Sequence, residues 1–433
     1  MSAVGARAVC VRGGRVFDPG QSLDRVGDVL VERGVITAIG PDVRPPADAR
    51  IVDARGRLVT PMFTDLHVHL REPGGEESET IATGTSAALA GGFATVFAMP
   101  NTSPTADSPE VIARVLAAAA AAGPCEVVPV SAITQGLRGR ALVDLAAQAR
   151  AGAGAFSDDG AWVASDELAA EAFRAAAEHD WLVMEHCEDF AMTGPGLLHD
   201  AAVVRDACIP GIPRASEDRA TSRDVELARR FGTRLHLCHV STAGAVAALR
   251  RAKDAGMSVS GEVTPHHLVL TVDDAVRGGV DFKMKPPLRE ASDVDALVRA
   301  LDDGTIDAVG TDHAPHADAK KSAGLDRAPF GAIGLETAFP VLFTELVRRG
   351  RLSLARLVDA LVGGPARVAR REPAAIRVGA PASVNVIDVT TERTVDRARL
   401  RSKSHNCPFH GRRLVGWPIA AVLGERLLAF DSV

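Results

Sequence analysis

The chain has 433 residues, 46% hydrophobic and 24% charged, so it can bury a large core and form one big α/β barrel with a smaller accessory unit. The net charge of −6, with Lys and Arg spread along the sequence, gives no basic patch and argues against a nucleic-acid partner. No apolar signal-peptide core is present and the longest apolar stretches are too short to span a bilayer, so we expect neither export nor membrane insertion.

Residues 1–60 form short β-like runs separated by turns. Val- and Ile-rich segments at 11–20, 26–40 and 49–61 are punctuated by Gly, Asp or Pro, and no long helix fits among them. Residues 371–433 repeat this style at 376–389 and 417–430. We therefore expect the two ends of the chain to form one small β-rich accessory domain beside the core.

Residues 61–370 change to a repeating pattern of strand, loop and helix. Helical segments rich in Ala, Leu, Arg and Glu, several closed by Gly, lie at 111–123, 142–152, 167–179, 222–232 and 245–256. Apolar strand-like runs lie at 62–70, 93–99, 125–133, 152–157, 181–186, 234–240, 257–263 and 306–311. Eight such units predict an α/β fold of the TIM (β/α)8 barrel type, whose active site lies at the C-terminal ends of the strands. The alternative, an open doubly wound sheet, lacks the expected GxGxxG after a first strand.

The first barrel strand ends with the histidine pair His67 and His69. Residues i and i+2 of a strand face the same way, so both imidazoles can reach one cation while Leu66 and Val68 pack on the opposite face. Such a pair alone is weak evidence, because two strand histidines are more often ordinary polar residues.

Other metal-capable side chains stand at the ends of four later strands: Asp158 and Asp159 on the fourth, His186 on the fifth, His239 on the sixth and Asp312 on the eighth. A set spread over five strands of one barrel is hard to produce by chance and predicts a metal site. Histidines with carboxylates suit Zn²⁺, and two ions sharing a carboxylate fit the set best. Asp158 and Asp159 compete for the shared position, and strand parity does not choose between them.

The alternation of side chains along a strand predicts that three further possible metal ligands are packing residues instead. His236 and Cys238 should point opposite to His239, and Cys187 opposite to His186. The six cysteines include no CxxC pair and do not suggest a disulfide scaffold. A reducing cytoplasm fits this usage best.

Over nearly its whole length the chain resembles dihydroorotases of the amidohydrolase superfamily, in particular the class I bacterial type. The resemblance rests on nine motifs: DLHVHLREPG (65–74), MPNTSPTAD (99–107), AITQGLRG (132–139), GAGAFSDDG (152–160), EHCED (185–189), LCHVST (237–242), VTPHHL (263–268), GTDHAPH (310–316) and APFGAIGLET (328–337). Together these motifs are highly specific.

The resemblance implies a ligand set and a reaction. One zinc ion would be held by His67, His69, Asp159 and Asp312, and the other by Asp159, His186 and His239. Class I dihydroorotases have an aspartate where many relatives carry a carboxylated lysine, and this match selects Asp159. Asp312 would also be the general acid/base, taking the proton of a bridging hydroxide and delivering it to the leaving nitrogen. In reverse, the site would close N-carbamoyl-L-aspartate into L-dihydroorotate, the third step of pyrimidine (UMP) synthesis.

The resemblance also implies a substrate-binding set: His69, Arg71, Asn101, Lys285, His316, Phe330 and Gly331. Arg71 can bind the substrate carboxylate with its planar fork, and Asn101 would supply an amide donor. His316, Phe330 and Gly331 fall in the loop after the eighth strand. Residues 313–334 of this loop form a candidate lid, because the segment is long, contains several glycines and follows Asp312.

One departure affects the expected substrate site. Relatives usually read NPPLR after the seventh strand, whereas this chain reads KPPLR and so places Lys285 there. A lysine could bind the carboxylate as a point charge, shift the specificity or obstruct the ring. A smaller departure, PAS at 381–383 where relatives commonly have PAD, lies away from the chemistry.

Three functions remain open at this point. The first is an active dihydroorotase, and the second is another cyclic amide hydrolase such as an allantoinase, dihydropyrimidinase or hydantoinase. The third is a non-catalytic partner of aspartate transcarbamoylase, although such chains typically lose metal ligands and this one has lost none. Barrels with accessory domains often self-associate, so a homo-oligomer and a complex with the transcarbamoylase both stay open.

Overall fold

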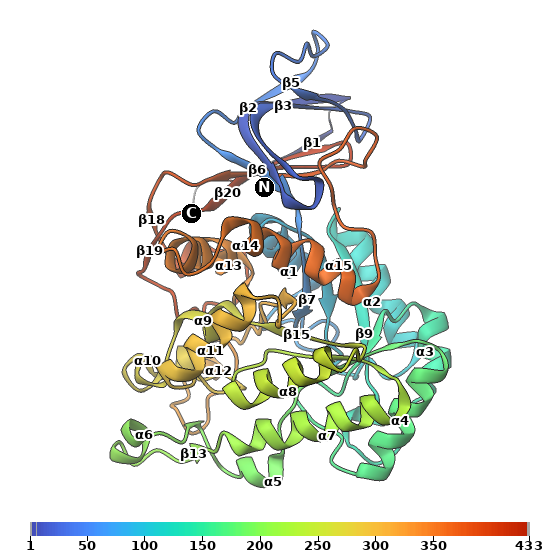
Figure 1. The fold of residues 1–433 in the computed structure, drawn as a ribbon, viewed down its shortest axis with the longest axis vertical. Coiled ribbons are helices and arrows are strands. Elements are labelled where there is room, and N and C mark those ends of the chain that lie inside the picture. The colour runs from blue at the N-terminus through green and yellow to red at the C-terminus, as the bar shows by residue number, and fades with distance from the viewer. Residues whose placement is uncertain (1, 6, 431–433) are drawn as a thin grey trace.

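The computed structural model describes residues 2–5 and 7–430. Figure 1 shows a layer of strands, formed by the blue N-terminal and red C-terminal segments, above a larger α/β body. No helix in the described part of the chain has both the length and the apolar character needed to cross a membrane.

The body is a barrel of eight parallel strands. In chain order they are β7 (Phe63–Val68), β8 (Phe93–Ala98), β9 (Glu126–Ser131), β10 (Ala155–Phe156), β11 (Leu182–Glu185), β14 (Arg234–Leu237), β15 (Val259–Val263) and β16 (Ala308–Val309). Neighbours in this order pair in parallel from β7 to β16. A single parallel bridge between Val68 and His313 links the two ends of the sheet. The predicted α/β barrel is confirmed. Its strands are shorter than the predicted runs, because the chain stops pairing with the neighbouring strands near the C-terminal end of the barrel.

Helices surround the barrel as the alternating pattern predicts. The outer helices are α1 (Ile81–Ala90), α2 (Pro109–Ala122), α3 (Leu145–Ala151), α4 (Asp166–Glu178), α7 (Ala215–Phe231), α8 (Ala243–Asp254), α11 (Ala291–Asp302), α14 (Leu354–Leu361) and α15 (Gly363–Ala369). Capping residues fix the ends of these helices. At the N-terminus of α8 the Thr242 hydroxyl accepts a hydrogen bond from the Ala245 N–H, and at the C-terminus of α7 Gly232 adopts a left-handed conformation with a φ of 74°.

Short elements fill the loops that follow the C-terminal ends of three strands. After β11 come α5 (Phe190–Thr193), β12 (Leu198–His199), α6 (Ala202–Asp206) and β13 (Gly211–Ile212). After β15 come α9 (Pro265–Val269) and α10 (Val272–Gly278), and after β16 come α12 (Asp318–Lys321) and α13 (Ala338–Leu342). These insertions enlarge the mouth of the barrel, where a TIM barrel carries its site.

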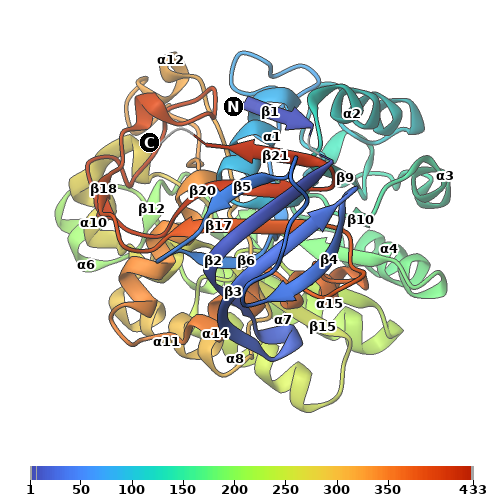
Figure 2. The same ribbon diagram turned by 90° about the horizontal axis from the view of Figure 1, so that it is seen from above.

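The accessory sheet is built from both ends of the chain. Its nine strands are β1 (Ser2–Gly5), β2 (Ala8–Asp18), β3 (Leu23–Glu32), β4 (Val35–Gly40), β5 (Arg50–Asp53), β6 (Leu58–Pro61), β17 (Ser383–Asp388), β20 (Trp417–Leu423) and β21 (Arg426–Ala429). The two halves join where β6 pairs antiparallel with β17, and Figure 2 shows the blue and red strands side by side. A separate pair, β18 (Arg393–Thr394) and β19 (Arg413–Leu414), lies in the C-terminal segment.

A buried side chain joins the accessory sheet to the barrel, and a buried ring cluster lies nearby within the barrel body. Asn385 on β17 is fully buried and its Nδ2 donates to the carbonyl of Gly92, 2.9 Å away, just before β8. Phe63 at the start of β7 packs against Phe93 and Phe339, with ring centroids 5.6 and 5.4 Å apart. The bottom of the barrel is therefore tightly packed.

Replacing Phe63 with Ala should leave a cavity in this ring cluster, because its side chain has no exposed surface. We expect the free energy of unfolding to fall by about 3–5 kcal/mol. Urea denaturation followed by tryptophan fluorescence measures this change. Val26, which is 68% exposed, provides the control: Val26→Ala should change stability by less than about 0.5 kcal/mol. Equal stability of the two variants would contradict the packing assigned to Phe63.

Candidate metal centre

His67 and His69 lie at the end of β7 and both reach the centre of the barrel mouth. His67 Nε2 lies 3.3 Å from Asp159 Oδ1, and His69 Nε2 lies 3.5 Å from Asp159 Oδ2. His69 Nε2 also lies 3.0 Å from Asp312 Oδ1. The two imidazoles therefore converge on the same carboxylates, as their i and i+2 spacing predicts.

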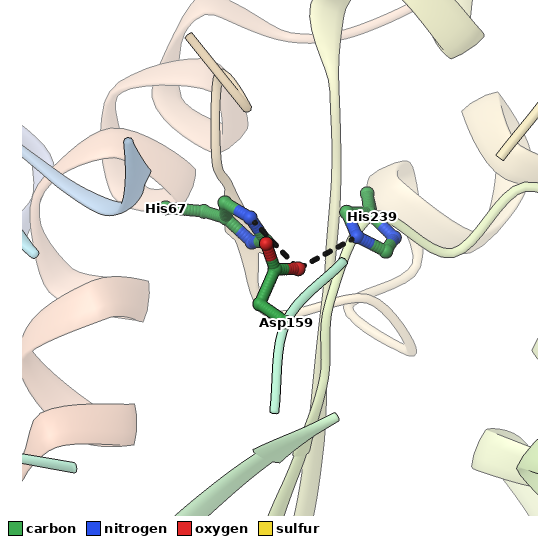
Figure 3. A group of neighbouring side chains, drawn as sticks. All are labelled: His67, Asp159 and His239. Carbon is green, nitrogen blue, oxygen red and sulfur yellow. Dashed lines mark ion pairs between the residues drawn. The ribbon is translucent and has the colours of Figure 1, made fainter. Parts of the chain in front are cut away.

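Asp159 lies at the middle of this cluster. Its Oδ1 is 3.7 Å from His186 Nδ1 and 3.5 Å from His239 Nε2, in addition to His67. Figure 3 shows the His67 and His239 rings on either side of the carboxylate. One carboxylate thus faces imidazoles from strands β7, β11 and β14, an arrangement suited to a ligand shared by two cations.

Asp158 points elsewhere. It accepts hydrogen bonds from the backbone N–H groups of Ile133 and Thr134, at 2.8 and 2.9 Å, and from the Thr134 hydroxyl. It therefore fixes the loop after β9, and of the two neighbouring aspartates only Asp159 faces the cluster.

Two atoms of the cluster fit a cation. His67 Nε2 and Asp159 Oδ1 are buried and have no hydrogen-bond partner among the described residues. Potential ligand atoms gather in two triads, each within 4.8 Å: His67, Asp159 and His239, and His67, His69 and Asp312. Since a buried polar atom without a partner is costly, a metal ion is the natural partner for this set, and imidazole with carboxylate is a donor set typical of Zn²⁺.

Two buried glutamates orient the imidazoles from behind. His67 Nδ1 lies 3.2 Å from Glu262 Oε1, and His186 Nε2 lies 2.9 Å from Glu188 Oε2. Burial alone would raise the pKa of Glu262, but hydrogen bonds from His236 and His67 lower it to about 2. A carboxylate accepting from the outer ring nitrogen leaves the other nitrogen as an acceptor that faces Asp159.

Sequence reasoning gave no role to either glutamate. Glu188 lies in the EHCED motif, and Glu262 lies in the otherwise small and apolar strand segment VSGEV. A lone acidic residue inside a strand buried on both faces was the available signal, because such a residue needs a partner.

Cys238 packs as expected, buried in a cluster with apolar side chains that include Leu66, Phe97 and Met184. Strand β14 ends at Leu237, and His239 adopts a φ of 34°, so the alternation of faces stops before these residues. The Cys238 Sγ and a His239 ring nitrogen both lie near His67. Burial raises the pKa of the Cys238 thiol well above its usual value, which keeps it neutral and makes it a poor metal ligand.

His236 is buried in the barrel below the cluster, and it is more than packing. Its Nε2 lies 3.2 Å from Glu262 Oε2 and its Nδ1 lies 2.8 Å from Ser260 Oγ. Cys187 faces away from the cluster, with its Sγ 3.4 Å from Asp224 Oδ2. Neither residue contacts Asp159 in the structure.

A cavity of about 300 Å³ opens beside the cluster. Its lining contains all seven residues that the sequence assigns to substrate binding: His69, Arg71, Asn101, Lys285, His316, Phe330 and Gly331. Asp159, His186, His239 and Asp312 also line it, whereas His67 lies behind the wall. The cavity has room for a small ring compound, and it brings the predicted metal ligands and substrate contacts into one space.

Arg71 is the uncompensated cation of this cavity. Its Nε donates to the carbonyl of Pro315 at 3.1 Å, and no carboxylate in the described residues forms an ion pair with it. Burial lowers the pKa of Arg71 to about 10, so the guanidinium stays charged at neutral pH. Asn101 accepts from His69 through Oδ1 at 2.8 Å, which leaves its NH₂ group as a donor.

Lys285, by contrast, is paired. Its Nζ lies 3.1 Å from Glu188 Oε1, and it stands over the rings of Phe190 and Phe330 at 4.6 and 4.8 Å. Glu188 thus contacts both Lys285 and His186. The positive charge that replaces the expected asparagine is therefore compensated within the wall of the cavity.

Comparison with known proteins identifies the family of the chain. A family model described as Dihydro-orotase-like matches residues 56–245. The dihydroorotase of Anaeromyxobacter dehalogenans is 48% identical over 96% of this chain and 97% of its own length. The dihydroorotase of Halalkalibacterium halodurans is 45% identical over 93% of this chain and 94% of its own.

Solved structures give the same architecture. The L-hydantoinase (dihydropyrimidinase) from Arthrobacter aurescens superposes with a TM-score of 0.87 at 26% identity, covering 98% of this chain and 96% of its own. The D-hydantoinase (dihydropyrimidinase) from Thermus sp. gives 0.83 at 26% identity, covering 98% and 95%. The high identity to curated dihydroorotases over nearly the full length shows that this chain is a hydrolase of the amidohydrolase superfamily and belongs to the dihydroorotase family.

Proposed function

We propose that the protein is a zinc-dependent dihydroorotase that interconverts N-carbamoyl-L-aspartate and L-dihydroorotate in the cytoplasmic synthesis of UMP. One observation carries this proposal: a single cavity contains the Asp159 cluster together with Arg71, an arginine that forms no ion pair with any carboxylate of the described residues. The cluster suits cleavage of a cyclic amide, and the arginine suits a substrate that carries a carboxylate. The names of the full-length relatives support the same assignment.

Six side chains would hold the metal. We assign His67, His69, Asp159 and Asp312 to one zinc ion and Asp159, His186 and His239 to a second. When bound, zinc supplies a positive charge that polarises the amide carbonyl and acidifies water. Glu262 and Glu188 hold the rings of His67 and His186 with the correct nitrogen facing the cluster.

Asp312 carries the proton in this proposal. It lines the cavity, and its Oδ1 lies 3.0 Å from His69 Nε2. Burial would raise the pKa of Asp312, but the hydrogen bond from His69 and the neighbouring imidazoles hold it well below the usual range. The carboxylate is thus ionised at neutral pH and ready to accept a proton from water, which it then delivers to the ring nitrogen as the amide bond breaks.

Substrate recognition falls to the remaining lining residues. Arg71 binds the carboxylate of dihydroorotate, and Asn101 donates from its amide to the same substrate. His316, Phe330 and Gly331 form the part of the cavity wall that comes from the loop after β16. Lys285 lies beside the ring with its charge balanced by Glu188, so it leaves carboxylate binding to Arg71.

A second candidate function is hydrolysis of another cyclic amide. The structural likeness to hydantoinases (dihydropyrimidinases) favours it, and an allantoinase belongs to the same class. A neutral ring, however, would leave the Arg71 charge without a partner in the cavity. A non-catalytic role beside aspartate transcarbamoylase has less support, because every proposed ligand faces the cluster.

The deciding experiment is the rate of ring opening by zinc-replete protein with L-dihydroorotate, dihydrouracil, hydantoin and allantoin in parallel. Turnover of L-dihydroorotate well above the other three supports the proposed function. Turnover only of a neutral ring favours the second candidate, and no turnover by protein that retains zinc refutes both.

Asp312→Asn should lower kcat by about 10²–10⁴-fold, because the amide cannot accept the proton while its shape is nearly the same. Steady-state kinetics with L-dihydroorotate measures the loss. Circular dichroism and the KM should stay close to those of the unmodified protein. Turnover near the original rate would refute the role of Asp312.

Arg71→Met should lower kcat/KM for L-dihydroorotate by about 30- to 1000-fold, since a charged hydrogen-bonded partner of the substrate is removed. Arg71→Lys is the matched control, because it keeps the charge but loses the bidentate fork. Its kcat/KM should lie between those of the Met variant and the unmodified protein. If all three proteins have the same kcat/KM, Arg71 does not bind the carboxylate.

A further inference from the structure

The loop that forms one wall of the cavity is held by a distant part of the chain. Residues 313–334 follow β16 and contribute Ala314, His316, Phe330 and Gly331 to the cavity lining. The C-terminal segment 401–406 runs against this loop, near α12, and His405 Nδ1 lies 3.0 Å from Asp318 Oδ2 there. Figure 2 shows the red segment beside α12.

Asn406 hydrogen-bonds both sides of the loop, which are also joined directly by the Ala314 N–H to the Ala332 carbonyl at 2.9 Å and by His316 Nε2, 2.7 Å from the Phe330 carbonyl. Its Oδ1 accepts from the His316 N–H at 3.1 Å, and its Nδ2 donates to the carbonyls of Ala314 and Gly331 at 3.0 and 3.1 Å. Its own carbonyl accepts from the Ile333 N–H at 3.0 Å. All side-chain polar atoms are therefore used, and the side chain is 1% exposed.

The segment that carries Asn406 is itself firmly attached to the barrel. Ser402 Oγ donates to Glu79 Oε2 at 2.6 Å, and Ser404 Oγ donates to the carbonyl of Ser78 at 2.6 Å. Glu79 has no exposed surface and its Oε2 also lies 3.3 Å from His313 Nε2, next to Asp312. These hydrogen bonds hold the backbone around Asn406 in place, so its side-chain amide contacts the loop from a fixed position.

We propose that Asn406 is a positioning residue of the substrate site, fixing the wall formed by His316, Phe330 and Gly331 at the distance that the substrate ring requires. It contacts neither the metal cluster nor the cavity itself, and acts through the backbone of the loop. The kinetic part of this inference rests on the proposed function. Loss of the amide should weaken substrate binding more than the chemical step, because wall geometry affects binding while the metal ligands stay in place.

Four hydrogen bonds from two lysines hold another part of the loop and show what Asn406 adds. Lys321 Nζ donates to the carbonyls of Lys283 and Pro329, and Lys283 Nζ donates to the carbonyls of Leu325 and Ala328. These lysines hold the outer part of the loop. Only Asn406, among the described side chains, hydrogen-bonds both backbone strands at its base, next to His316 and Gly331.

The test compares Asn406→Ala and the milder Asn406→Ser with two controls. Ser404→Ala weakens the same segment without touching the loop, and Asn385→Ala removes another buried amide far from the cavity. For Asn406→Ala we expect KM for L-dihydroorotate to rise about 10-fold or more while kcat changes less than about threefold. Zinc content should stay unchanged. The KM of Asn406→Ser should lie between those of Asn406→Ala and the unmodified protein, and the KM of both controls should stay within about twofold of the unmodified protein.

A second readout needs no substrate. Arg327 is exposed within the loop, so trypsin cleavage after it reports how often the loop opens. We expect cleavage of Asn406→Ala to be about 10-fold faster, with the controls unchanged. If the unmodified protein lacks dihydroorotase activity, the proposed function fails, but this readout still decides the role of Asn406.

Two outcomes would overturn the inference. The first is an Asn406→Ala protein with unchanged KM and unchanged cleavage. The second is an equal shift of KM in Ser404→Ala, which would show that attachment of the segment matters and the amide does not.

Discussion

The buried carboxylate of Asp159 is the constraint around which the barrel mouth is organised. Burial raises the pKa of Asp159, but the imidazoles of His67, His186 and His239 hold it well below its usual range. A charge in this position is tolerable only if cationic or hydrogen-bonding groups surround it. The strands that supply those groups must therefore have their C-terminal ends close together. Parallel pairing around the barrel brings these ends to one side of the sheet.

The same requirement extends outward to the glutamates. Glu262 and Glu188 place negative charge behind the imidazoles, and each lies close to a second nitrogen-bearing side chain, His236 at 3.2 Å from Glu262 and Lys285 at 3.1 Å from Glu188. Carboxylates and nitrogen-bearing side chains therefore alternate outward from Asp159. Within this pattern Arg71 stands out, because it lines the cavity and forms no ion pair with a carboxylate of the described residues.

The sequence predicted the architecture and much of the site, because both depend on local pattern. Eight apolar runs followed by helical segments predicted the barrel, and metal-capable residues at strand ends predicted the cluster. Three features could not be derived from the strand and helix pattern alone. Strand parity left Asp158 and Asp159 as alternatives and only the family resemblance favoured Asp159, because the choice depends on a long-range contact, the binding of the Asp158 carboxylate by the N–H groups of Ile133 and Thr134. The turn at His239 broke the parity rule, and Asn406 contacts loop residues that lie 75 to 92 positions away in the sequence.

The pairing of β6 with β17 has a consequence for how the polypeptide matures. Pro61 lies opposite Val384, so β6, which pairs with β2 on its other side, gains its second neighbour only after the barrel sequence has been translated. The hairpins formed by β2, β3 and β4 are local and can form early, whereas β6 keeps an open edge during that interval. On a polysome, where nascent copies are close together, this edge is the place where one chain can capture the strand of another, and a chaperone that shields the first sixty residues would suppress that exchange.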